Sequence, residues 1–215
     1  MTPTFSLPNM FEIIIQQYKN IPNWQIGLEL IVFIFGILSV YFAKKENILV
    51  YPTGIIATVL SIYIMYNAKY FADMSINIYY SVMSIYGWYQ WKKITNGTTL
   101  SISRTNIKEK SIGVILFIIT AIVCVFIYQF FDYKLQINNY LDIFTTSLFF
   151  TAMWYMARKK IENWTLWIIG DAICVYIFFD RHLYIIAIQY IIFTILALSA
   201  YLEWKKYLAK KIYNK

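Results

Sequence analysis

The sequence has few charged residues, one histidine and two cysteines, and each shortage excludes a class of protein. Charged residues make up 14% of the 215-residue chain, whereas soluble domains contain roughly a quarter. With His182 as the single histidine, a structural metal site is not expected, and we expect no metal or other cofactor. Cys124 and Cys174 both lie in apolar runs, so a disulfide framework is not expected either.

Apolar residues dominate the chain and are gathered into long runs. Hydrophobic residues make up 60% of the sequence, and the mean hydropathy is +0.55. A membrane β-barrel would show short alternating segments, and none is visible. Each run is close to the ~20 residues that a helix needs to cross a bilayer. The sequence therefore predicts an all-α polytopic membrane protein with seven transmembrane helices. The runs cover about residues 24–43, 48–67, 70–91, 112–131, 140–157, 163–180 and 183–204.

The segments outside these runs differ in composition. Residues 1–23 contain three prolines and one short apolar patch, but neither a basic region nor a small-residue cleavage site. They are therefore not a signal peptide, and we expect either a short interfacial helix or a disordered leader. Residues 92–111 form a long basic loop, and residues 207–215 form a basic tail.

The basic residues indicate an orientation. They gather in the first, third and fifth loops and in the tail, whereas the N-terminus and the even loops are poorer in them. Lys and Arg favour cytoplasmic loops, so the N-terminus is predicted outside and the C-terminus in the cytoplasm. The unbroken alternation also supports the count of seven spans. Because this placement explains the net charge of +8, no nucleic-acid partner is expected.

The two ends of the chain resemble each other. Glu46-Asn47 precedes Gly54 at the same separation as Glu162-Asn163 precedes Gly170, and Trp91-Lys92-Lys93 matches Trp204-Lys205-Lys206. These matches predict two three-helix repeats, 24–91 and 140–206, with 112–131 as a connector. A single connecting span lets both repeats cross in the same direction, which gives a 3+1+3 parallel repeat. Such repeats are typical of transporters that bind substrate between their halves, although chance similarity in apolar sequence is an alternative.

The sixth run contains two indoles and a carboxylate on one helical face. Trp164, Trp167 and Asp171 are spaced i, i+3 and i+7, so they lie along one stripe. Such a stripe would suit a flat, positively charged ligand, because the rings can stack and the carboxylate can act as counter-ion. The alternative is that the tryptophans anchor the span at the interface. Asp171 fits that alternative less well, since intramembrane carboxylates are costly and are by default functional candidates.

A second polar stripe lies in the third run. Its members share one helical face: Asp73, Asn77, Tyr80, Ser84 and Trp88. If the two stripes face each other across the repeat axis, they enclose a polar cavity. Alternatively, Asp73 lies at the outer interface and Asn77 bonds a neighbouring helix.

Three further residues complete the candidate set. In the seventh run, Gln189 and Tyr190 are the polar candidates, although an intramembrane amide is as often a helix–helix contact as a ligand contact. Pro52 near the start of the second run predicts a kink, which serves either as a gating hinge or as a static packing feature. No nucleophile–base pair, phosphate loop or Walker-type lysine is present, so no enzyme activity is expected.

Together these residues resemble the signatures of the PnuC vitamin transporters, over about residues 24–206. The first-half signature consists of Tyr70-Phe71-Ala72-Asp73-Met74, Asn77, Tyr79-Tyr80 and Met83-Ser84-Ile85-Tyr86-Gly87-Trp88-Tyr89-Gln90-Trp91. The second-half signature consists of Asn163-Trp164, Trp167, Asp171, Leu183-Tyr184 and Tyr190. The Tyr-Gly-Trp-Tyr string and the Asn-Trp…Trp…Asp spacing are the more specific parts.

The resemblance implies a fold and a function. The family has a 3+1+3 helix arrangement similar to that of the SWEET proteins. Its members are homotrimers that carry nicotinamide riboside, or in sub-branches thiamine or riboflavin, across the bacterial inner membrane. Transport is facilitated diffusion, and a cytoplasmic kinase traps the vitamin by phosphorylating it for NAD synthesis. Mapped by motif, Asn163, Trp164 and Trp167 surround the aromatic base.

The sequence departs from the family pattern at a few positions, which leaves the sub-branch open. His182 and Ser199-Ala200 stand where glycine is expected, and Tyr51 stands where many members have tryptophan. We expect nicotinamide riboside as the first candidate substrate and thiamine as the second, because both are flat cations that suit Asp171. The alternatives from other classes are a membrane-embedded enzyme and a non-transporting scaffold or receptor, in which the polar stripes are packing contacts.

Overall fold

The structure is a computed structural model that describes residues 12, 15–16, 19, 21–68, 71–95, 98–130 and 136–213. The predicted leader falls largely outside these residues, and so does the side chain of Asp73. All seven predicted spans are confirmed as helices, with ends that differ by a few residues. The helices are α2 (Asn23–Lys44), α3 (Val50–Asn67), α4 (Phe71–Lys92), α5 (Ile107–Phe130), α6 (Ile137–Ala157), α7 (Glu162–Asp180) and α8 (Tyr184–Tyr213).

The helices differ in how apolar they are. By length and composition, four helices among the described residues could cross a membrane: α2, α3, α5 and α8. The other three, α4, α6 and α7, carry more polar side chains, including those of both predicted stripes. A helix with a polar face is stable in a bilayer only when that face is covered by protein. The less apolar helices are therefore expected to face the interior of the bundle.

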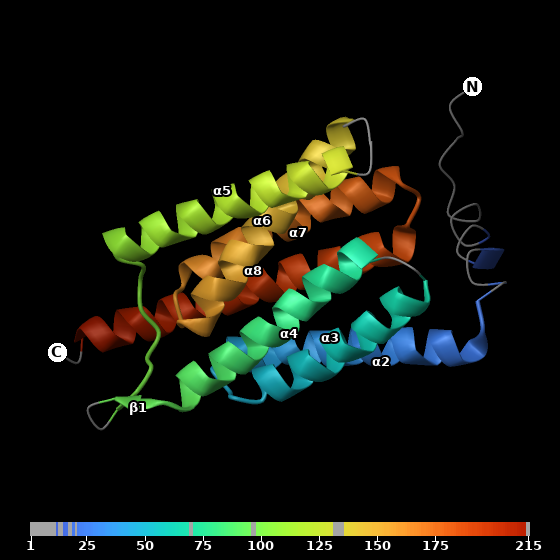
Figure 1. Ribbon diagram of the computed structural model, residues 1–215. Helices are drawn as coiled ribbons and strands as arrows, with labels where there is room; N and C mark the ends of the chain where they lie inside the picture. Colours follow the sequence, from blue (N-terminus) through green and yellow to red (C-terminus); the bar gives the residue numbers. More distant parts are fainter. Residues whose placement is uncertain are drawn as a thin grey trace.

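Packing divides the bundle into two triplets and a connector (Figure 1). In the first triplet α3 packs against α2 and α4, and in the second α7 packs against α6 and α8. The connector α5 packs against α6. The triplets meet through two helix pairs, α2 with α8 and α4 with α6. Because the first helix of each triplet contacts the third helix of the other, the two are related by a pseudo-twofold axis, as the predicted 3+1+3 repeat requires.

The turn geometry fixes the register of the repeat and corrects part of the sequence match. Glu46 and Lys159 both have positive φ, 56° and 51°. In each turn the backbone N–H of this residue returns to the carbonyl three residues earlier, on Ala43 or Met156. The separation from Glu46 to Lys159 equals that from Trp91 to Trp204, so the tryptophan match is confirmed. The pairing of Glu46 with Glu162 is wrong by three residues.

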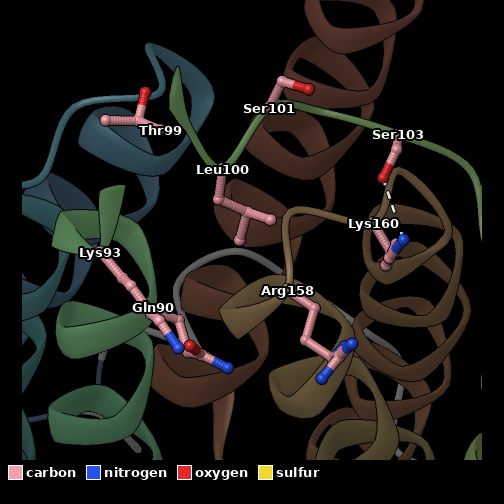
Figure 2. A pocket seen from close by; sticks show the side chains of 8 residues that line it. All are labelled: Gln90, Lys93, Thr99, Leu100, Ser101, Ser103, Arg158 and Lys160. Atoms are coloured by element: carbon pink, nitrogen blue, oxygen red, sulfur yellow. Dashed lines mark hydrogen bonds between the residues drawn. The ribbon is translucent and has the colours of Figure 1, made fainter. Parts of the chain in front are cut away.

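The long loop after α4 is more ordered than a basic linker requires. It begins with a small antiparallel hairpin, β1 (Ile94–Thr95) and β2 (Thr98–Thr99). It then runs beside the loop between α6 and α7, where Ser103 donates its backbone N–H to Lys159 and accepts one from Ile161. The Lys160 ammonium also donates to the Ser103 hydroxyl at 3.0 Å (Figure 2). These contacts hold the loop against the end of the bundle that carries Lys44, Lys92, Arg158 and Lys205, called the basic end below.

A close approach of α3 to α4 depends on a glycine. A Cβ at Gly87 would lie 2.4 Å from Cε1 of Tyr51, far inside van der Waals contact. Tyr51 is 1% exposed, so its ring has no open space into which to retreat. By contrast, no atom of the described part of the chain lies within 4 Å of a Cβ built on Gly27 of α2.

This difference gives a paired test of the helix packing. Gly87→Ala should destabilise the protein by ~1–3 kcal/mol, because the added methyl overpacks the α3–α4 contact. Gly27→Ala should be neutral or slightly stabilising, since alanine favours helix over glycine. Thermal unfolding of both variants purified in detergent measures the effect. Equal melting temperatures for the two variants would contradict this packing.

Candidate functional site

Asp171 lies halfway along α7 and is buried. Its residue is 4% exposed, and among the described residues it accepts no hydrogen bond and forms no ion pair. Its electrostatic neighbours are Tyr80 of α4, Cys174 one turn further along α7, and Tyr190 of α8. A carboxylate in this position is costly unless something compensates it. The geometry therefore keeps Asp171 as the counter-ion candidate.

Aromatic rings from both triplets converge beside Asp171. The ring centroids of Tyr80 and Trp167 are 6.4 Å apart. Phe149 of α6 stacks on Trp167 at 5.0 Å and faces Tyr190 at 6.5 Å. The structure thus brings together four predicted residues, Trp167, Asp171, Tyr80 and Tyr190. They form the central cluster, which is supplied by α4, α7 and α8.

Two phenylalanines that the sequence did not single out complete this cluster. Phe149 lies between Trp167 and Tyr190, and Phe150 stacks on Tyr79 at 3.8 Å. Phe149 fits only because Gly170 has no side chain, since a Cβ there would lie 2.3 Å from its ring. Aromatic side chains of α6 thus lie against members of both predicted stripes, Trp167 of α7 and Tyr80 of α4. Apolar residues in an apolar run give no signal of such a position.

Three further predicted residues, Asn77, Gln189 and Pro52, lie in α4, α8 and α3. The backbone carbonyl of Asn77 accepts a hydrogen bond from the Ser81 hydroxyl at 3.0 Å. Both residues belong to α4, so this bond joins successive turns of the same helix. Gln189 is half-buried and makes no hydrogen bond with the residues that the structure describes. Pro52 is the third residue of α3, where a helical N–H has no intrahelical partner. It therefore interrupts no helical hydrogen bond, and nothing at this position supports the predicted kink.

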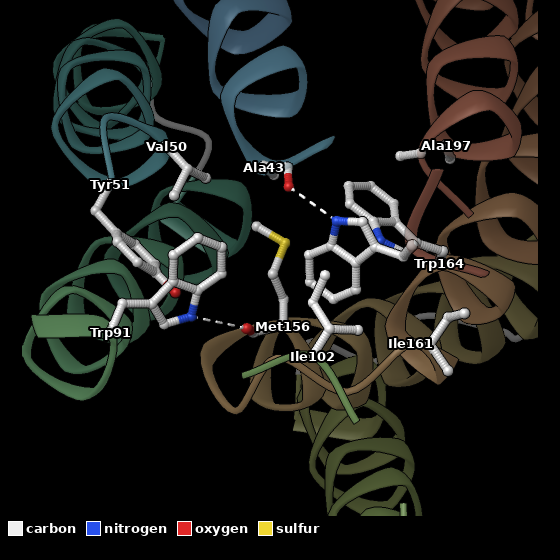
Figure 3. Packing of buried hydrophobic residues seen from close by; sticks show 11 residues of the cluster. Ala43, Val50, Tyr51, Trp91, Ile102, Met156, Ile161, Trp164 and Ala197 are labelled. Atoms are coloured by element: carbon white, nitrogen blue, oxygen red, sulfur yellow. Dashed lines mark hydrogen bonds between the residues drawn. The ribbon is translucent and has the colours of Figure 1, made fainter. Parts of the chain in front are cut away.

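Asn163 and Trp164 lie at the basic end rather than beside Asp171. Asn163 is 0% and Trp164 2% exposed. Trp164 meets Trp204 edge-on, with centroids 5.5 Å apart and planes at 87°. The equivalent pair in the first triplet, Tyr51 and Trp91, has nearly the same geometry, at 5.1 Å and 85°. Both aromatic pairs belong to one buried cluster, in which Figure 3 labels Tyr51, Trp91 and Trp164.

Hydrogen bonds join these aromatic pairs to the opposite triplet. The Trp91 indole N–H donates to the carbonyl of Met156 at 3.3 Å, and the Trp204 indole N–H donates to the carbonyl of Ala43 at 3.2 Å (Figure 3). Ile102 of the long loop packs into the same buried cluster. The basic end is closed in this conformation.

An ion pair reinforces the closure. The Lys159 ammonium lies 2.6 Å from a carboxylate oxygen of Glu46 and 4.4 Å from the centroid of the Trp91 ring. Lys159 is 5% exposed, so this pair is largely desolvated. Glu46 and Lys159 are equivalent residues of the two repeats, and opposite charges at equivalent positions let them bond each other across the axis.

Several buried polar atoms in this region have no partner among the described residues. They include the Tyr51 hydroxyl, the Asn163 carbonyl oxygen Oδ1 and the Trp164 indole Nε1. Buried polar groups are normally hydrogen-bonded, and leaving one unpaired costs about 1–3 kcal/mol. Asn163 and Trp164 thus remain candidates for contact with a polar ligand.

Fold and site together define a multi-pass membrane transporter rather than an enzyme. Two equivalent helix triplets surround a buried carboxylate and aromatic rings, and one end is closed by contacts between the triplets. The model of the family described as "Nicotinamide mononucleotide transporter" matches residues 26–206, and the chain belongs to this family, the PnuC family of the sequence analysis.

Individual proteins agree with this assignment. The chain is 28% identical to "Nicotinamide riboside transporter PnuC" of Escherichia coli (strain K12) over 195 residues, covering 80% of this chain and 82% of that protein. The match to the protein of the same name from Shigella flexneri has the same identity and coverage. The fold is similar to a solved structure titled "Crystal structure of the Vitamin B3 transporter PnuC", with a TM-score of 0.67 at 20% identity over 95% of this chain and 90% of that chain.

The indole bonds can be tested without changing the packing much. Trp91→Phe combined with Trp204→Phe keeps two large rings but removes both N–H donors. We expect a loss of about 1 kcal/mol of stability per bond and faster hydrogen exchange at the ends of α2 and α6. Trp24→Phe is the control, because Trp24 is 51% exposed. If exchange at these ends does not change in the double variant, the indole bonds do not hold the basic end closed.

Proposed function

We propose that the protein carries nicotinamide riboside across the bacterial inner membrane by facilitated diffusion. The observation that carries the proposal is the buried Asp171, which has no ionic partner among the described residues and lies beside aromatic rings from both triplets. Nicotinamide riboside has a flat pyridinium ring with a positive charge. Such a cation gains from aromatic faces by cation–π attraction and from a desolvated carboxylate by direct charge pairing.

The position of the central cluster suits alternating access. Its residues come from α4 of the first triplet and from α6, α7 and α8 of the second, so a bound substrate touches both triplets. Opening the basic end requires the two indole bonds and the Lys159–Glu46 pair to separate. As they separate, Asn163 and Trp164 leave their buried positions, and their unpaired polar atoms become available to the substrate on its way out.

The orientation and partners follow from the same proposal. The basic end faces the cytoplasm, because it gathers the lysines and arginines of alternate loops; the N-terminus is outside. A cytoplasmic kinase makes uptake one-way by phosphorylating the vitamin, which feeds NAD synthesis. The working assembly is a homotrimer, as the resemblance to the family implies.

Thiamine is the second candidate substrate. It is also a flat cation, so Asp171 and the surrounding rings suit it by the same chemistry. Riboflavin carries no positive charge and would leave the carboxylate uncompensated. The distinction between the two cations requires a direct comparison of their binding.

Reconstituted vesicles provide the direct test. Vesicles that contain the purified protein, a nicotinamide riboside kinase and ATP should accumulate labelled nicotinamide riboside, whereas vesicles without the protein should not. Unlabelled thiamine added in excess measures competition. If uptake is equal with and without the protein, the carrier proposal is wrong. If thiamine is taken up and nicotinamide riboside is not, the substrate assignment is wrong.

Substitutions in the central cluster should weaken substrate binding without preventing folding. Asp171→Asn removes the charge at constant size and should lower affinity about tenfold or more. Trp167→Ala should cost ~1–3 kcal/mol of binding if the indole stacks on the ligand. Binding is read by calorimetry on protein with an unchanged melting temperature.

Two matched controls accompany these variants. Asp180→Asn changes a carboxylate at the exposed end of the same helix, and Trp24→Ala removes an exposed indole. Both should bind substrate as the unmodified protein does. Unchanged affinity in Asp171→Asn would remove this carboxylate from the site.

A further inference from the structure

A second concave site lies at the basic end, away from the central cluster (Figure 2). It has a volume of about 380 Å³. Three separate chain segments line it: the end of α4 with Gln90 and Lys93, residues 99–103 of the long loop, and the loop between α6 and α7 with Arg158 and Lys160. Small-molecule sites typically have volumes of ~300–1,000 Å³, so the pocket has room for a small metabolite.

The charged residues that line the pocket are all positive. Lys93, Arg158 and Lys160 line it, and no carboxylate is among its lining residues. Glu109 reaches in from α5, 2.9 Å from the Lys160 ammonium and 3.6 Å from the Arg158 guanidinium. This single carboxylate is shared by two of the three cations. Lys93 forms no ion pair with any described residue, so positive charge remains uncompensated on the α4 side.

Neighbouring side chains hold the guanidinium of Arg158 and the ammonium of Lys160 in position. The Arg158 guanidinium lies 5.3 Å from the centroid of the Trp154 ring, which supports it. Its Nε is buried and has no hydrogen-bond partner among the described residues. Lys160 is held by the Ser103 hydroxyl at 3.0 Å as well as by Glu109. Although Nε is enclosed, the Arg158 side chain as a whole is 37% exposed, so other donors of its guanidinium remain accessible to a ligand.

We propose that this pocket binds the phosphate group of a small cytoplasmic molecule, a phosphate monoester of about nucleotide size. Arginine and lysine are the residues that recognise phosphate, and arginine does so through paired N–H donors. The general enrichment of cations in cytoplasmic loops explains their number. It does not explain why three cations from two separate segments converge on one pocket.

Occupation of the pocket would affect the closed end. Lys93 belongs to the first triplet, whereas Arg158 and Lys160 belong to the second. A phosphate bonded to both sides ties the triplets together at the end that must open, so the bound monoester slows release of the carried solute. This consequence rests on the proposed transport function, whereas the binding itself does not.

Binding is tested on the full-length protein in detergent by calorimetric titration with AMP, with inorganic phosphate, and with adenosine as the matched compound without phosphate. AMP and phosphate should bind competitively, and adenosine should not bind. Lys93→Gln should weaken AMP binding about tenfold, as expected for the loss of one charge-assisted bond. Arg158→Lys keeps the charge but removes the paired N–H donors of the guanidinium, and should weaken AMP binding comparably. Lys206→Gln, at an exposed position of the same end outside the pocket, should not.

The possible outcomes separate the explanations. Equal weakening by Lys93→Gln and Lys206→Gln would mean diffuse attraction and overturn the site, as would equal binding of AMP and adenosine. In nanodiscs, AMP binding that persists with neutral lipid but disappears with phosphatidylglycerol would assign the pocket to a lipid headgroup and overturn the soluble ligand.

AMP inside the vesicles should slow uptake by the unmodified protein and have less effect on Lys93→Gln. If uptake is absent even without AMP, the transport proposal fails. If uptake proceeds and AMP does not bind, only this inference fails.

Discussion

Two indole-to-carbonyl hydrogen bonds across the repeat axis join the two triplets at the basic end. Each indole N–H from one triplet meets a carbonyl at the end of the first helix of the other, on Met156 or Ala43. That carbonyl already accepts a backbone N–H from the following turn, and the indole takes its second lone pair. Where water is excluded, such donors have few alternative partners. The aromatic pairs, the Lys159–Glu46 ion pair and Ile102 all pack around these two bonds.

The two repeats have equivalent backbones but different side chains at equivalent positions. These differences put the carboxylate and the indole of the central cluster in the second repeat. The position equivalent to Asp171 in the first triplet is Thr58, which shares a hydrogen bond of 2.7 Å with Ser81. The position equivalent to Trp167 is Gly54. The carboxylate and its neighbouring indole therefore occur only in the second triplet, so the central cluster is asymmetric. The two equivalent triplets can move symmetrically about their axis. The asymmetric central cluster between them can bind an asymmetric ligand in one orientation.

The sequence predicts the helices well because their signal is additive along the chain. Each span needs a long apolar run, and no tertiary detail changes that requirement, so seven runs gave seven helices. The two triplets could also be predicted, since Trp91 and Trp204 occupy equivalent positions in the third helix of each triplet. The register between the two repeats could not be predicted. Glu46-Asn47 and Glu162-Asn163 match by residue type, but this match is shifted by three residues from the alignment of the two backbones. Only the turn, with positive φ at Glu46 and Lys159, fixes it.

The candidate site was predicted in part, for a related reason. Helical spacing correctly placed Trp164, Trp167 and Asp171 along α7, but it could not show how far along the bundle each would lie relative to other helices. In the structure, Trp164 lies in the closed basic end, whereas Trp167 lies beside Asp171. Phe149 and Phe150 give no polar signal in the sequence, although their rings contact Trp167 and Tyr80. The glycine expected at His182 had a physical basis, because this residue has φ of 58°, a conformation that glycine adopts most readily.

The central claim is that the basic end opens by separation of the two triplets when substrate is carried. Spin labels at positions 92 and 205, which are equivalent exposed positions on α4 and α8, measure this directly by pulsed electron resonance in a variant with Cys124 and Cys174 replaced. The account predicts one distance distribution without substrate and an additional, longer one with nicotinamide riboside. A distribution that stays unchanged at saturating substrate, in protein that still transports, would contradict it.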